Sequence, residues 1–84
     1  MSLPHLTPAE KRMLDACAAY ADRDGAFEWS DVQTDQTSTA QPSALGWATF
    51  LRTADRLFAK GLVTTSGGDA YGALTELGRQ ACGW

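Results

Sequence analysis

The fold is decided by one stretch of the chain, Leu57-Phe58-Ala59-Lys60-Gly61-Leu62-Val63. It joins an amphipathic segment to a β-branched run, and Gly61 stands between them, where a left-handed residue commonly ends a helix. Upstream, the spacing of apolar residues predicts a long helix over residues 43–60, with Ser43 as its N-cap. The core-facing stripe of this helix, about 120° wide, is expected to comprise Trp47, Phe50, Leu51, Ala54, Leu57 and Phe58.

Downstream of the long helix, the pattern predicts a β-hairpin. Residues 62–65 are rich in β-branched side chains, and residues 66–69 read Ser-Gly-Gly-Asp, which is typical of a tight turn. Residues 70–74 can then return as the partner strand. Thr75 is placed to cap a last short helix, which is expected to run from Glu76 to about Ala81.

The N-terminal part of the chain begins with a clear helix start. Thr7 and Glu10 have the spacing of a capping box, in which each side chain bonds the backbone N–H of the other residue. Pro8 falls at the first helical position, where its missing N–H costs nothing. These signals predict a helix over residues 8–22, with Gly25 as its left-handed end.

A short strand and a second helix are expected next. Residues 26–29 are aromatic and alternating, which favours a brief strand. Ser30 and Gln33 have the spacing of a second capping box, so a short helix over residues 31–37 is predicted to follow. Trp29 is interpreted, like the tryptophan of the long helix, as a core residue.

The order of these elements resembles the winged helix-turn-helix family over about residues 7–81. The passage from the long helix through Gly61 looks like the family's third helix running into the first wing strand. Residues 71–79, Tyr-Gly-Ala-Leu-Thr-Glu-Leu-Gly-Arg, are similar to the leucine-threonine-x-x-glycine-arginine exit from the wing in many bacterial regulators.

This resemblance implies an α+β fold that is mainly α. It comprises three helices, a short strand, a two-stranded β-hairpin wing and a short C-terminal helical turn. The chain is then a single domain over residues 1–84, with a tail over 1–6 and a core over 7–81, and its length fits one domain.

The resemblance also implies a function. In this family the third helix usually enters the DNA major groove, so the chain is expected to be a transcriptional regulator that binds double-stranded DNA as a homodimer. Thr49 and Arg52 would approach base edges, since arginine can bond guanine bidentately. Arg56 and Lys60 would neutralise phosphates. Ser43 would donate to a phosphate or only cap the helix.

The charges leave a plainer interpretation open, because any amphipathic helix turns its charged residues to water. Residues 43–61 carry Arg52, Arg56 and Lys60 against Asp55 alone, while the whole chain has a net charge of −3. Three cations per monomer predict a salt slope of only about −2 to −3 for DNA binding.

A second hypothesis is therefore a winged helix that does not bind DNA and serves as a protein-interaction module. Its contact surface would be the acidic part of the first two helices, which would meet a basic partner. The candidate residues on this surface are Asp15, Asp22, Asp24, Asp31 and Asp35.

The rest of the sequence offers little for catalysis. His5 is the only histidine, and Cys17 and Cys82 are the only cysteines, with no metal-ligand spacing around them. We therefore expect no enzyme, no catalytic residue, no metal and no cofactor. No run of apolar residues is long enough for a membrane span, the N-terminus lacks the apolar stretch of a signal peptide, and a cytoplasmic location is expected.

Overall fold

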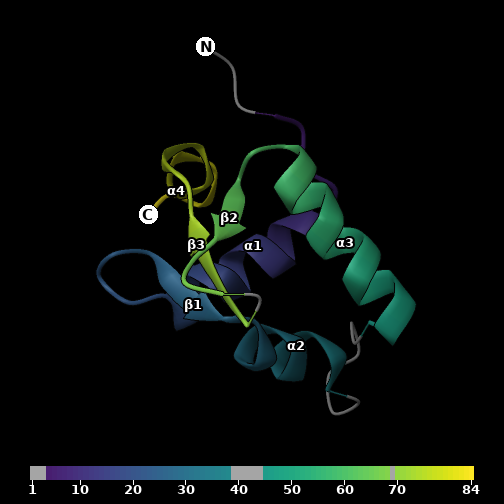
Figure 1. Ribbon diagram of the computed structural model, residues 1–84. Helices are drawn as coiled ribbons and strands as arrows, with labels where there is room; N and C mark the ends of the chain where they lie inside the picture. The colour runs from purple at the N-terminus through teal and green to yellow at the C-terminus, as the bar shows by residue number, and fades with distance from the viewer. Residues whose placement is uncertain (1–3, 39–44, 69) are drawn as a thin grey trace.

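The computed structural model describes residues 4–38, 45–68 and 70–84, which form a small α+β domain that is mainly helical (Figure 1). In chain order, its elements are α1 (Pro8–Tyr20), β1 (Ala26–Glu28), α2 (Trp29–Thr37), α3 (Trp47–Ala59), β2 (Val63–Thr65), β3 (Tyr71–Leu74) and α4 (Glu76–Cys82).

The first helix begins as predicted and ends earlier. The Thr7 side chain accepts from the Glu10 amide, and the Glu10 carboxylate accepts from the Thr7 amide, so the capping box is confirmed. The helix ends at Tyr20 instead of residue 22, because Asp22 belongs to the following turn. Its carboxylate accepts from the amides of Asp24 and Ala26, at 2.9 Å and 3.0 Å.

The second helix starts before its predicted cap. Trp29 is already helical, the N-cap is Glu28, and no side chain caps the helix, so the capping box at Ser30 was wrong. The reason is that β1 passes directly into α2. The Trp29 amide still donates to the Ala70 carbonyl at 3.0 Å, which leaves no separate capping residue between strand and helix.

The third helix is shorter than predicted. It starts at Trp47 after the N-cap Gly46, and the expected cap Ser43 lies outside the described residues. Leu45 is not helical, because its amide donates to the carbonyl of Gln36 at the end of α2, at 2.8 Å. This bond ties the chain to α2 just before α3 begins.

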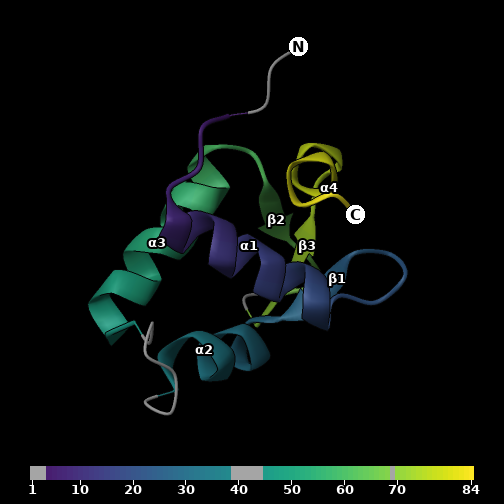
Figure 2. The same cartoon turned by 180° about the vertical axis from the view of Figure 1, so that it is seen from behind.

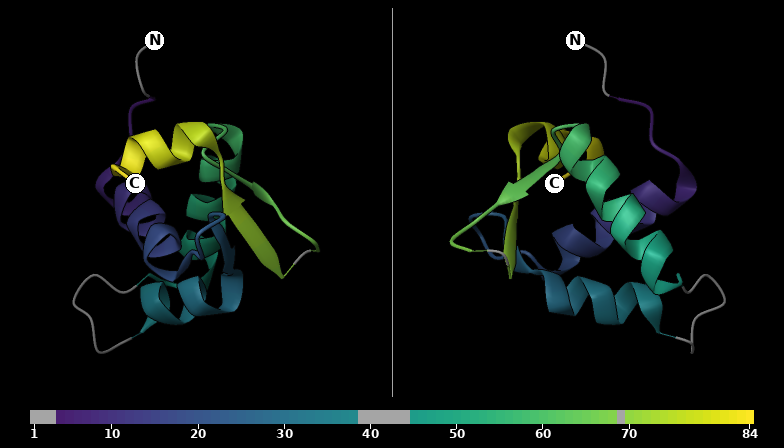
Figure 3. Two further views of the ribbon diagram at one scale, coloured as in Figure 1. Left: turned by 90° about the vertical axis from the view of Figure 1, so that its left-hand side faces the viewer. Right: turned by 45° about the vertical axis from the view of Figure 1, so that its right-hand side comes forward.

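The predicted hairpin is confirmed and gains a third strand. β2 and β3 pair antiparallel, and β1 pairs with the other edge of β3, which gives the order β1-β3-β2. Gly72 lies opposite Phe27, and a side chain at Gly72 would collide with the rings of Phe27 and Trp29. The β2–β3 hairpin projects to one side of the domain, away from the helices (Figure 3).

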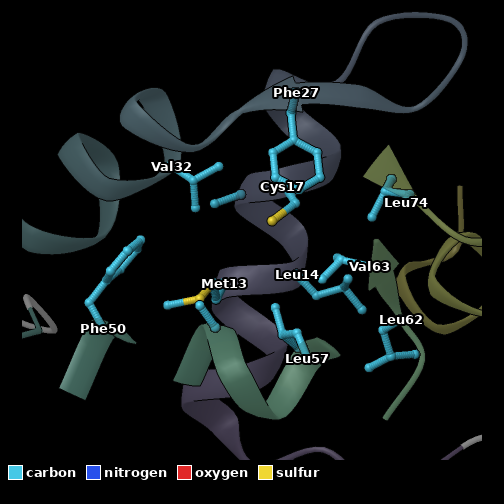
Figure 4. Close-up of a cluster of buried hydrophobic side chains, with 12 residues drawn as sticks. Met13, Leu14, Cys17, Phe27, Val32, Phe50, Leu57, Leu62, Val63 and Leu74 are labelled. Atoms are coloured by element: carbon cyan, nitrogen blue, oxygen red, sulfur yellow. The ribbon is translucent and has the colours of Figure 1, made fainter. Parts of the chain in front are cut away.

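The core lies around α1, which crosses between α3 on one side and β3 and α4 on the other (Figure 2). Cys17 is fully buried in this core, as predicted, and its burial raises the pKa of the thiol to about 12. The labelled core residues in Figure 4 are Met13, Leu14, Cys17, Phe27, Val32, Phe50, Leu57, Leu62, Val63 and Leu74.

The close approach of α4 to Leu62 gives a stability prediction. A Cβ at Gly78 would overlap the backbone carbonyl oxygen of Leu62, and backbone cannot move aside as a flexible side chain can. We expect Gly78→Ala to lower the free energy of unfolding by about 3 kcal/mol in urea denaturation. The exposed Gln80→Ala on the same helix should change it by less than about 0.5 kcal/mol. Equal effects of the two variants would contradict this packing.

Candidate functional site

Helix α3 buries only one narrow face. Its buried residues are Phe50, Thr53, Ala54 and Leu57. Thr53 is tolerated in the core because its hydroxyl donates to the Thr49 carbonyl one turn earlier, at 2.7 Å, which satisfies the polar group. The buried face shares Phe50, Ala54 and Leu57 with the predicted stripe, but it is rotated by about 50° toward Thr53.

Three of the predicted core residues lie at the surface. Trp47 is 56% exposed, Leu51 45% and Phe58 37%, so their assignment to the core was wrong. At 100° per residue they fall within about 40° of one another on α3. We call Trp47, Leu51 and Phe58 the apolar row.

The apolar row is backed by aromatic rings that hold it in place. The Trp47 ring stacks on Phe50, with centroids 5.9 Å apart. Phe58 lies 5.7 Å from the ring of Trp29, which itself meets Phe27 edge-on at 4.8 Å. Trp29 is only partly buried, so it extends the row toward the start of α2. Trp47 and Phe58 are thus each packed against a second aromatic ring.

A different flank of α3 carries the residues expected to contact DNA. Thr49, Arg52 and Arg56 are all exposed and follow one another at helical spacing. Within the described ranges 4–38, 45–68 and 70–84, no hydrogen bond or ion pair engages either guanidinium group. Asp55, also exposed, lies between this flank and the apolar row. The structure therefore brings together three of the five predicted site residues.

Lys60 is the predicted residue that the structure places elsewhere. Its ammonium group is ion-paired with the carboxylate of Glu10 and also donates to the His5 carbonyl at 2.7 Å. Glu10 is only 1% exposed, so the pair is shielded on the carboxylate side. Lys60 thus holds the end of α3 against the start of α1. The fifth predicted residue, Ser43, lies outside the described residues.

The electrostatics of Glu10 follow from this pairing. Burial by itself would raise the pKa of its carboxyl, but hydrogen bonds from Lys60 and Thr7 and the charge of Lys60 outweigh that effect. The pKa of Glu10 is therefore lowered from its ordinary value.

The acidic candidates are partly engaged inside the domain. Asp15 is ion-paired with Lys11 at 2.6 Å, and Asp22 holds the turn after α1. Asp35 accepts from the Tyr20 hydroxyl at 3.4 Å, and the Asp35 charge raises the pKa of Tyr20. Asp24 and Asp31 are exposed, as the second hypothesis needs.

The β2–β3 hairpin carries no lysine or arginine, and the arginine of α4 is engaged elsewhere in the domain. Residues 62–78 contain neither lysine nor arginine. Arg79 donates to the Asp24 carbonyl at 2.7 Å, and its guanidinium lies 5.0 Å from the centre of the Trp84 ring. Trp84 therefore folds back onto α4.

Across the part of the chain that the structure describes, no three His, Cys, Asp or Glu residues gather where they could hold a metal ion. Over the same residues, none of the helices has the length and apolar character to cross a membrane.

Comparison with known proteins adds no assignment. No protein-family model, no curated protein and no solved structure matches the chain.

The Glu10–Lys60 pair gives a second stability prediction. Lys60→Ala leaves a buried carboxylate without its cation and should lower the free energy of unfolding by about 3 kcal/mol. This loss is at the lower end of the range for broken buried ion pairs, because the Lys60 side chain is 29% exposed. Lys11→Ala breaks an exposed pair and should cost less than about 1 kcal/mol. Urea denaturation at neutral pH measures both.

The pH dependence of this stability loss shows whether it comes from the broken ion pair or from lost packing of the Lys60 side chain. A lowered pKa means that the stability from Glu10 is present above its unfolded pKa of about 4.3 and is lost as the pH falls through the folded value. The difference between wild type and Lys60→Ala should therefore shrink in acid. A difference that stays constant down to acid pH would show that the ion pair is not its source.

Proposed function

We propose that this domain is a winged helix-turn-helix that works as a protein-interaction module, with the apolar row of α3 as its docking surface. The element order α1-β1-α2-α3-β2-β3 and the sheet order β1-β3-β2 support the fold assignment. The β2–β3 hairpin then corresponds to the wing, and α3 to the third helix of the family.

The observation that carries the function is the exposure of three large apolar side chains in one row. Single exposed apolar residues are normal on a protein surface, whereas a contiguous group commonly marks an interaction site. Trp47, Leu51 and Phe58 are 56%, 45% and 37% exposed and share one side of α3. Aromatic residues are enriched at the centres of protein interfaces, and tryptophan is frequent among residues that dominate binding energy.

The charges around α3 favour a protein partner over DNA. With Lys60 paired to Glu10, α3 retains two unpaired arginines among its described residues, and Asp55 lies beside them. Two phosphate contacts per chain would give a salt slope of only about −2. The outward side of α3 also includes apolar side chains, which do not attract a phosphate backbone.

DNA binding remains a second candidate, and Thr49, Arg52 and Arg56 are the observation that favours it. These exposed residues stand on one flank of the helix that reads the major groove in this family. Arginine suits both guanine edges and phosphates. This candidate needs a homodimer, because the cations of a single chain are few.

The two candidates are separated by matched variants of α3. Leu51→Lys should weaken capture of a protein partner from a lysate of the source cells by about tenfold or more, since it places a charge in the middle of the apolar row. Arg56→Ala, at an exposed position away from the apolar row, should leave this capture unchanged. Both sites are exposed, so circular dichroism should show that each variant remains folded.

The opposite pattern would overturn the proposal. If a mixed-sequence duplex binds at low salt in fluorescence anisotropy, loses its binding in Arg52→Ala/Arg56→Ala and keeps it in Leu51→Lys, then DNA is the ligand. Capture that does not respond to Leu51→Lys would also exclude the apolar row as the docking surface.

A further inference from the structure

We propose that the partner docked on the apolar row is a second copy of this chain, with the two α3 helices antiparallel around a two-fold axis. This inference rests on the proposed function, since it names the partner of the same surface. It is carried by the order of residues along α3 and by the charges beside the row.

The apolar side chains of α3 are arranged so that the row can meet itself. Trp47 and Phe58 stand at its two ends, about 16 Å apart along the helix, and Leu51 lies between them. When two such helices run antiparallel about the middle of α3, Trp47 of each copy comes opposite Phe58 of the other. The two Leu51 side chains then lie on either side of the two-fold axis, about 4.5 Å apart along the helices. Each aromatic ring thus gains an apolar neighbour, and the contact between Trp47 and Phe58 occurs twice, as in every two-fold interface.

The charges beside the row are complementary in the same arrangement. Asp55 lies about 60° from the centre of the row, and Arg52 lies about 60° further round the helix. In an antiparallel pair the same flanks face each other, so Asp55 of each copy approaches Arg52 of the other. The two residues are offset by about 3 Å along the axis, within the reach of an arginine side chain. The symmetry forms this ion pair twice.

Both charged groups are available for such a pair. Asp55 and Arg52 are exposed, and no ion pair among residues 4–38, 45–68 and 70–84 involves either of them. Ala48, one turn before Arg52, lies between the two residues round the helix, and its small side chain leaves room for the arginine. Among the described residues, Arg52 and Asp55 are therefore a cation and an anion without ion-pair partners at the edge of an apolar surface.

The position of α3 in the domain allows a second helix to approach. Figure 3 (right) shows α3 over its full length at the edge of the fold, with no other helix or strand drawn in front of it. The buried face of α3 packs on α1, and Leu51 and Asp55 lie about 110° and 150° round the helix from the centre of that face. One helix pair buries less than the roughly 800 Å² per partner of a standard interface, so we expect a dimer of micromolar affinity.

Sedimentation velocity tests the inference directly. Over concentrations from about 5 to 500 µM, the range that brackets a micromolar dissociation constant, the wild type should pass from the mass of a monomer to that of a dimer. Leu51→Glu should remain monomeric at every concentration. Glu76→Arg, a charge reversal at an exposed position of α4, should dimerise as the wild type does.

Charge-reversal variants of Arg52 and Asp55 test the antiparallel arrangement of the two α3 helices. Arg52→Asp and Asp55→Arg should each weaken the dimer about tenfold, because like charges then face each other. The double variant Arg52→Asp/Asp55→Arg should restore the wild-type dissociation constant, since each pair is rebuilt with its signs exchanged. Rescue by the double variant is an outcome that a merely structural role of either residue would not produce.

The outcomes also separate this inference from the proposed function. A wild type that stays monomeric throughout overturns the second copy as the partner, while capture of a different protein sensitive to Leu51→Lys would still support docking on the apolar row. A dimer that survives Leu51→Glu, or a double variant without rescue, places the interface elsewhere and overturns the antiparallel arrangement.

Discussion

The contact between the start of α1 and the end of α3 sets the orientation of α3. That orientation decides which side chains of α3 lie at the surface of the domain. Lys60 reaches the buried carboxylate of Glu10, while Leu57 fills the core one turn earlier. These two anchors fix the rotation of α3 about its own axis. Thr53 consequently faces inward, and the side of the helix that carries Trp47 and Leu51 faces outward. A rotation of α3 that buried Trp47 would withdraw Lys60 from Glu10 and leave a buried carboxylate unpaired, which is costly.

Much of the fold could be predicted from local signals. The capping box at Thr7, the glycine at residue 61 and the β-branched run over 62–65 each specify a structure within a few residues, and the structure has the helix, the helix end and the strand there. The capping box at Ser30 failed because the strand before it continues directly into the helix. The sequence indicates that β1 is a strand, but the pairing of β1 with β3 depends on contacts that no local pattern encodes.

The candidate site was less accessible to prediction. Periodicity identifies an apolar stripe, but it does not say how much of that stripe a small core can bury. The stripe of α3 is wider than the space left by Met13, Leu14 and the sheet, so Trp47, Leu51 and Phe58 remain outside. Likewise, a lysine on a helix surface gives no sign that it will pair with a glutamate fifty residues earlier. Thr49, Arg52 and Arg56 share one exposed flank, because side chains at helical spacing lie on the same side of a helix wherever that helix packs.

The central claim is that α3 binds its partner through the apolar row, and that the flank of Thr49, Arg52 and Arg56 is not a DNA-binding surface. Amide and indole NMR spectra of the isotopically labelled chain would test this, recorded first over a dilution series and then with added mixed-sequence duplex at low salt. The account predicts that dilution shifts the signals of Trp47, Leu51 and Phe58, together with those of Arg52 and Asp55, and that the duplex changes little. Spectra that do not change on dilution, with duplex-induced shifts concentrated at Thr49, Arg52 and Arg56, would contradict it.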